Sequence, residues 1–262
     1  MIDKKEFLLQ SIIKAYIEHL EPIGSSQLKS MYDITYSPAT IRGYFKKLGD
    51  EGYLAQEHIS SGRTPTIEAL KEFWIRRLNF KLDFVNIETL KYVANQIGVC
   101  VFIKEQKTDT LKNILNVENK YMILEFNSFS ITIKYSSALH RFLQDMIGLD
   151  INHIVKISKQ VGAYELYEQI NVYLQNSSFN IINSKEFLKL ALEFDLDEFM
   201  INSFLKGEVI DKCEEDIYFE NLLPIGHIGI CHKCKINAKD SKILVIGELS
   251  KNYEYFYERI AS

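Results

Sequence analysis

Residues 37–47 combine small side chains, hydroxyl groups and cations at spacings that place them on one side of a helix. At about 100° per residue, Ile41, Tyr44, Phe45 and Leu48 fall on the opposite, apolar side. The polar side and the helix start comprise Ser37, Ala39, Thr40, Arg42, Gly43, Lys46 and Lys47. Small residues allow close approach to a DNA groove, and cations reach phosphates or guanine edges. The pattern favours contact with duplex DNA over its alternative, a helical cap whose cations are simply hydrated.

The segment "YLAQEHISSGRTPT", which starts at Tyr53, has the pattern of a strand, a tight loop and a second strand. Pro65 confines the second strand to a sheet edge, because proline cannot donate to a ladder. The hairpin is expected to place Arg63 at its tip. Further candidate DNA contacts on the hairpin are His58, Ser60 and Gly62.

Residues 227–234, "HIGICHKC", could carry metal or thiol chemistry. Together with Cys213, residues His227, Cys231 and Cys234 could supply the four ligands of a structural zinc, and a C-x-x-C pair can form a redox disulfide. The alternative is that Cys231 lies in a buried strand as a small hydrophobe. We favour this alternative and expect neither a metal nor another cofactor.

Known catalytic motifs are missing from the sequence: a Gly-rich phosphate loop, H-E-x-x-H and a Ser nucleophile elbow. The chain is therefore not expected to be an enzyme. Its 262 residues are 47% apolar, enough for a sizeable core, and its net charge is −4. Residues 1–80 carry 11 Lys and Arg against 10 Asp and Glu, so a DNA site depends on where the charges lie. No apolar run of about 18 residues suggests a membrane span, and the expected location is the cytoplasm.

The elements that must position the DNA-facing residues can be read from capping and breaking signals. Apolar spacing predicts helices at residues 4–20 and 26–31, separated by Pro22 and Gly24. Ser37 before Pro38 is a helix-start signal, so a third helix is expected from there to about Gly52. Three helices followed by a hairpin predict a winged helix-turn-helix. Residues 68–80 are expected to be a connecting helix, and Trp74 is expected to pack between domains.

Four segments of this region, "EPIGSSQL", "SPATIR", "LGDEGYL" and "HISSGRTPT", resemble the N-terminal domain of the HrcA family of heat-inducible transcription repressors of bacteria. The resemblance covers roughly residues 5–75. It implies that residues 37–42 belong to a recognition helix and residues 58–63 to a wing. Gly43 and Tyr44 depart from the family, which usually has Asn and then an acidic residue there. The operator sequence therefore cannot be carried over from the family.

Beyond residue 80 the pattern changes to mixed α/β, and the overall fold class is expected to be α+β. A helix at residues 86–98, a hairpin at residues 121–136 with its turn at Asn127 and Ser128, and strands near the C-terminus fit a GAF-like domain. The expected organisation is a winged domain at 1–80, GAF-like parts at 81–148 and 211–262, and a helical insertion at 149–210. The resemblance to HrcA implies that the insertion dimerises. "ILVIGELSKNYEYF" is its best C-terminal anchor, through Gly247 and Tyr253.

The resemblance implies a homodimeric repressor that binds double-stranded DNA at an inverted-repeat operator upstream of chaperone genes. It also implies that the GroEL chaperonin modulates this activity. Two alternatives remain open from the sequence. One is a repressor that senses a ligand, metal or thiol signal through its GAF-like domain, and the other is a winged helix used for protein contacts.

Overall fold

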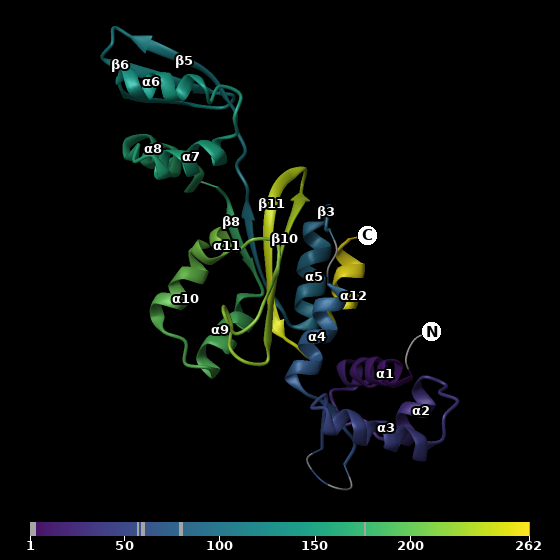
Figure 1. The fold of residues 1–262 in the computed structure, drawn as a ribbon. Helices are drawn as coiled ribbons and strands as arrows, with labels where there is room; N and C mark the ends of the chain where they lie inside the picture. The colour runs from purple at the N-terminus through teal and green to yellow at the C-terminus, as the bar shows by residue number, and fades with distance from the viewer. Residues whose placement is uncertain (1–3, 57, 59–60, 79–80, 176, 262) are drawn as a thin grey trace. The chain divides into compact units, whose positions relative to one another are not determined.

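The computed structural model describes residues 4–56, 58, 61–78, 81–175 and 177–261 (Figure 1). The fold is mixed α and β, and the chain forms two compact units. The first comprises Met1–Ile103, Asn180–Ala238 and Lys242–Ser262, and the second comprises Lys104–Phe179 with Lys239–Ser241. In the described part of the chain, no helix is both long and apolar enough to cross a membrane.

The N-terminal part of the first unit consists of short helices and a small sheet (Figure 1). The elements are α1 (Lys4–His19), α2 (Ser25–Met31), α3 (Pro38–Asp50), β1 (Leu54–Ala55), β2 (Thr64–Pro65) and α4 (Ile67–Arg77). β1 pairs antiparallel with β2, and Ile23 forms an antiparallel bridge with Arg63. The three helices and the hairpin predicted here are therefore present.

The remainder of the first unit is built on a six-stranded sheet in the order β3-β10-β11-β4-β8, with β9 paired to β10. These strands are β3 (Phe84–Val85), β4 (Cys100–Glu105), β8 (Phe179–Ile182), β9 (Ile217–Tyr218), β10 (His227–Ile236) and β11 (Lys239–Glu248). Its helices are α5 (Ile87–Ile97), α9 (Ser184–Glu193), α10 (Glu198–Leu205), α11 (Glu208–Lys212) and α12 (Tyr253–Ile260). The sheet thus joins segments that are far apart in the sequence.

The two faces of this sheet are covered by different helices, because successive side chains of a strand point to opposite faces. Val99, Val101 and Val245 belong to the core that also contains residues of α5 and α12. On the other face, the ring of Phe102 lies 5.3 Å from that of Phe187 in α9 and 5.6 Å from that of Phe204 in α10. Both faces are therefore buried, and Figure 1 shows the two groups of helices on either side of β10 and β11.

Gly247 and Tyr253, the C-terminal anchor of the family resemblance, depend on each other for packing. A Cβ on Gly247 would lie 2.7 Å from the Tyr253 hydroxyl oxygen and 2.8 Å from Val99 Cγ1. The buried Tyr253 hydroxyl donates to the Glu248 carbonyl at 3.0 Å. The residue at position 247 therefore has to lack a side chain so that the tyrosine can close the core.

The second unit contains a three-stranded antiparallel sheet and three helices. Its strands are β5 (Leu111–Val117), β6 (Tyr121–Phe126) and β7 (Ser130–Lys134), in that order. Its helices are α6 (Ser137–Gln144), α7 (Ile151–Gln160) and α8 (Tyr164–Gln175). Met122, Leu124 and Ile133 on one face of the sheet share a core with Leu143, Ile154 and Ile170 of the helices.

The boundaries of the second unit differ from the predicted insertion at 149–210. The hairpin with its turn at Asn127 and Ser128 is present, but it pairs with β5 in the second unit and not with the C-terminal strands. Apolar alternation in β6 and β7 predicts that this sheet has one apolar face, but it does not identify the elements that pack against that face. In the structure, α6 to α8 pack against it. Helices α9 to α11, predicted in the insertion, belong to the first unit. That unit also includes residues 1–80, which were predicted as a separate domain.

Candidate nucleic-acid interface

The start of α3 is fixed by the cap that the sequence predicts. Ser37 has an extended backbone, and its hydroxyl oxygen accepts from the Thr40 backbone N–H at 3.1 Å. The Ser37 and Thr40 hydroxyl oxygens lie 2.9 Å apart. Both residues are exposed, so the cap presents two hydroxyl groups to solvent at the first turn of the helix.

The predicted division of α3 into two faces is present in the structure. Ile41 and Leu48 are fully buried, and Phe45 is 3% exposed. The other face is exposed and consists of Ala39, Thr40, Arg42, Gly43, Lys46 and Lys47. A Cβ built on Gly43 meets no atom within 4 Å, so packing does not require glycine there. The middle of this face is an open surface on which another molecule can approach the helix backbone.

The three cations of α3 are available for an anionic partner. The Arg42 guanidinium donates to the Ser25 hydroxyl oxygen at 3.3 Å, which draws it toward the start of α2. The Lys47 ammonium lies 5.7 Å from the centroid of the Tyr44 ring. Among the described residues, no carboxylate forms an ion pair with Arg42, Lys46 or Lys47. Positive charge on this face is therefore not neutralised by the described part of the chain.

The loop between β1 and β2 is held by Ser61. Its hydroxyl oxygen accepts from the His58 backbone N–H at 3.1 Å and donates to the His58 carbonyl at 2.7 Å. His58 itself is exposed. Ser60, another predicted contact, lies outside the residues that the structure describes.

Arg63 is not at the tip of the hairpin, where the sequence places it. Its backbone N–H and carbonyl each bond to Ile23 at 2.9 Å, and β2 begins at the next residue. The hairpin strands are only two residues long, and the chain between α1 and α2 adds a third short pairing at their base. Arg63 is partly buried and lies at the base of the hairpin.

Gly62 has a packing role that the sequence interpretation missed. A Cβ at this position would lie 2.5 Å from the Ile23 carbonyl carbon and 2.6 Å from the Pro22 carbonyl carbon and oxygen. These neighbours are backbone atoms and cannot rotate away. Glycine is therefore required for the Ile23–Arg63 pairing, which joins two segments that are far apart in the sequence.

The connecting helix α4 attaches this region to the rest of the first unit. Trp74 is 1% exposed, and its indole N–H donates to the Leu249 carbonyl at 2.8 Å. Its ring meets that of Tyr253 edge-on, with centroids 5.2 Å apart. Arg76 pairs with Glu6 at 2.8 Å, and Arg77 pairs with Glu254. Trp74 was predicted to pack between domains; it is buried, and its partners Leu249 and Tyr253 belong to the same compact unit as Trp74 itself. Both arginines are engaged in ion pairs.

The cysteines do not assemble into the metal or redox site considered from the sequence. Cys234 belongs to the core on the α5 and α12 side of β10, while Cys231 has the opposite parity in the strand and points to the other face. All four thiols are free and buried, and burial raises the pKa of Cys231 and Cys234 to about 12. In the described part of the chain, Cys213 and His227 do not complete a group able to hold a metal ion.

Comparison with known proteins decides the family. A sequence model described as the HrcA C-terminal domain matches residues 74–262. The chain belongs to the HrcA family. Among its HrcA relatives is the heat-inducible transcription repressor HrcA of Helicobacter pylori, in two strains. These are 29% and 30% identical over 264 residues, covering 99% of this chain and 95% of the relative. The protein of the same name from Thermodesulfovibrio yellowstonii is 25% identical over 261 residues, covering 88% of this chain and 70% of the relative.

Proposed function

We propose that this HrcA-family chain is a transcription repressor that binds an operator in duplex DNA through the exposed face of α3. The proposal is carried by three features of that face: cations without an ion-pair partner among the described residues, an open Gly43, and a helix start capped by Ser37. A helix that enters the major groove needs close approach and cations that reach phosphates or base edges. In this proposal α1 to α3 with β1 and β2 form a winged helix-turn-helix, and the chain acts in the cytoplasm without enzymatic activity.

Two charge-removing variants of the full chain test this assignment. Arg42→Ala is expected to weaken operator binding by roughly 1–3 kcal/mol, typical of a base or charged phosphate contact, without loss of stability. Arg141→Ala in α6 is the matched control, because it removes an exposed arginine that is not on α3. Fluorescence anisotropy with labelled duplex DNA gives both affinities. Equal affinity of folded Arg42→Ala and the unmodified chain would remove Arg42 from the interface.

We propose further that the operator is an inverted repeat bound by a homodimer. Two recognition helices related by a two-fold axis match two symmetric half-sites. In the second unit, the sheet face opposite α6 to α8 carries Leu115, Val117 and Tyr121, which are 41%, 40% and 49% exposed. Strand pairing aligns Leu115 with Ile123 and Val117 with Tyr121, so these side chains form one apolar strip. A second copy that contributes the same strip would cover it, as an isologous dimer contact requires.

The dimer contact is tested by sedimentation of the full chain. Leu115→Lys places a charge in the strip and is expected to shift the dimer toward monomer and weaken operator binding through lost avidity. Val172→Lys is the matched control, because it places the same charge at another exposed apolar residue of this unit: Val172 is 62% exposed and lies on α8, outside the strip. Loss of the dimer in Val172→Lys but not in Leu115→Lys would show that the dimer contact involves α8 and not the strip on the sheet.

The proposed target genes are heat-shock chaperone genes, with activity modulated by the GroEL chaperonin. The support is family membership and the name of the relatives, heat-inducible transcription repressor. A fold near its stability threshold suits such control, since 1–2 kcal/mol changes the folded population several-fold. The six-stranded sheet unit is proposed to be the GAF-like domain of this arrangement. Operator binding measured after heating, with and without added chaperonin, tests the coupling: recovery that does not depend on chaperonin counts against it.

A further inference from the structure

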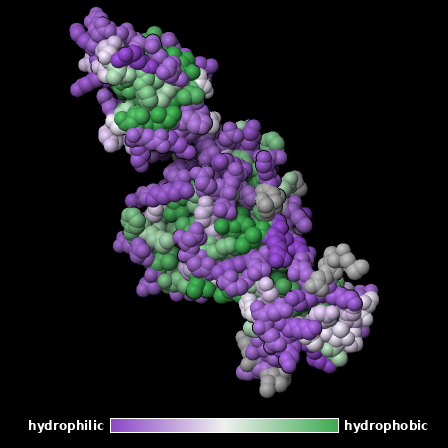
Figure 2. Space-filling model, viewed as in Figure 1, coloured by the Kyte–Doolittle hydropathy of each residue, from purple (hydrophilic) through white to green (hydrophobic). Residues whose placement is uncertain are grey.

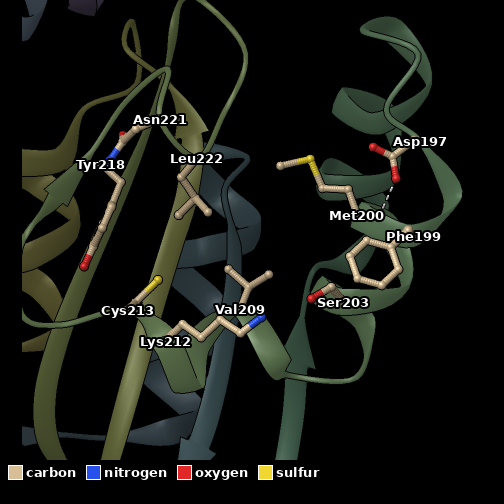
Figure 3. Close-up of a pocket in the computed structure, with 10 residues that line it drawn as sticks. All are labelled: Asp197, Phe199, Met200, Ser203, Val209, Lys212, Cys213, Tyr218, Asn221 and Leu222. Carbon is tan, nitrogen blue, oxygen red and sulfur yellow. Dashed lines mark hydrogen bonds between the residues drawn. The ribbon is translucent and has the colours of Figure 1, made fainter.

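A cavity of about 430 Å³ lies within the first unit, between α10, α11 and the chain around β9 (Figure 3). The volume is in the range of pockets that hold small molecules. The least exposed residues of its lining are Ser203 and Cys213, which are 7% and 4% exposed. The lining therefore extends from exposed residues to nearly buried ones.

The walls of this cavity are apolar. Phe199 and Met200 of α10 form one side, Leu222 lies on the opposite side, and Val209 lies between them (Figure 3). Phe199 is 80% exposed, which leaves a large aromatic side chain at the cavity rim in contact with water. Apolar side chains also reach the surface of this unit in Figure 2. Covering Phe199 with an apolar ligand would remove this area from water, and such burial is favourable.

The cavity lining carries one cation, Lys212, and one carboxylate, Asp197. Lys212 is exposed, its side chain points toward Ser203 in Figure 3, and it forms no ion pair among the described residues. The one carboxylate in the lining, Asp197, accepts from the Met200 backbone N–H at 2.8 Å as the cap of α10. The Ser203 hydroxyl donates to Glu208 at 3.2 Å. The Lys212 ammonium is thus the group left to bind a ligand.

We propose that this cavity is a binding site for a small amphipathic carboxylate, such as a medium-chain fatty acid. The carboxylate would bind the Lys212 ammonium, and the alkyl chain would lie between Phe199, Met200 and Leu222. Lysine suits a single carboxylate as a point charge on a flexible stem. The site is separate from α3, so this inference goes beyond DNA binding and does not depend on it.

Calorimetric titration of the full chain with three probes of equal chain length tests the site. The probes are decanoate and decyltrimethylammonium, each below its micellar concentration, and decanol, below its solubility limit. Decanoate is expected to saturate one site per chain and to bind at least tenfold more tightly than the cation. Lys212→Met keeps the apolar stem and removes the charge, so it should weaken decanoate binding about tenfold and leave decanol unchanged. Lys206→Met is the matched control, an exposed lysine at the end of α10 outside the cavity.

A second variant, Met200→Trp, fills the cavity and should reduce the binding of decanoate and decanol together. Circular dichroism establishes whether Met200→Trp is folded. If Met200→Trp does not fold, Lys212→Met still tests the site, because Lys212 is exposed and its replacement leaves the core intact. Equal affinity for the three probes, no saturable binding of decanoate, or the same loss in Lys206→Met as in Lys212→Met would each overturn the proposal.

Discussion

Replacing Gly43 by Ala separates the stability of α3 from its contact with DNA, because the two effects have opposite signs. Gly43 lies in the middle of a helix that runs from Pro38 to Asp50. Glycine in a helix interior costs about 1 kcal/mol relative to alanine. A Cβ at Gly43 meets no atom within 4 Å, so the new methyl group causes no clash inside the protein. The free energy of unfolding should therefore rise by about 0.5–1 kcal/mol.

The same methyl group should weaken operator binding. It projects from the centre of the face formed by Thr40, Arg42 and Lys46, where the proposal brings the helix backbone against the groove. An extra methyl group in a tightly packed contact costs about 1–3 kcal/mol, which corresponds to roughly a fivefold to 150-fold loss of affinity. No other proposal for this face predicts a more stable protein that binds DNA more weakly.

Urea unfolding followed by the fluorescence of Trp74, the single tryptophan, measures the stability of the first unit. Anisotropy with operator DNA measures the affinity. Gly49→Ala is the matched control in the same helix: its Cβ would lie 3.5 Å from the Leu54 carbonyl oxygen, an ordinary contact, and it should leave affinity unchanged. Gly43→Ala with raised stability and unchanged affinity would refute close approach of DNA at this position.

Two further predictions concern stability. Gly62→Ala should destabilise the first unit by about 2–4 kcal/mol, because the new Cβ would lie 2.5 Å from the Ile23 backbone. Thermal unfolding followed by Trp74 fluorescence measures the loss. A loss below about 0.5 kcal/mol would contradict the close contact between Gly62 and Ile23. Burial alone would raise the pKa of Asp109, but hydrogen bonds from Ser128 and from backbone N–H groups outweigh burial and lower it. The ionised Asp109 therefore stabilises the folded second unit at pH values above about 4, the pKa of an unfolded aspartate. This stabilisation is lost as the pH falls through the lower pKa that Asp109 has in the folded protein. Asp109→Asn should lower the stability of the second unit by about 2 kcal/mol at neutral pH and make that stability less dependent on acid pH. Hydrogen exchange of residues 109–134 as a function of pH measures this stability. Equal acid sensitivity in the variant and the unmodified chain would contradict the role given to Asp109.

The local elements of the N-terminal region could be predicted because their signals lie within a few residues of each other. Ser37 before Pro38 specifies the start of α3, and the spacing of Ile41, Phe45 and Leu48 specifies its buried face. The exposed candidates on α3 follow directly from that spacing. Their roles in DNA binding remain predictions.

The features that the sequence did not reveal depend on partners far away in the chain. The position of Arg63 follows from pairing with Ile23, a residue before α2, and Gly62 is required by the same pairing. β5 was missed because its residues from Lys112 to Val117 are mostly exposed and show no apolar alternation. The C-x-x-C spacing suggested a shared site, but strand geometry turns Cys231 and Cys234 to opposite faces.

Operator binding by α3 can be tested by selecting bound sequences from random duplex DNA with the full chain, since this experiment assumes neither an operator nor a set of contact residues. Parallel selections with the unmodified chain and with Arg42→Ala show whether α3 reads the bases. If α3 reads the operator, the unmodified chain should enrich an inverted repeat, and Arg42→Ala should give weakened or altered enrichment. Enrichment of the same sequence to the same degree by both proteins, or no enrichment by the unmodified chain, would contradict the proposal that α3 binds an operator.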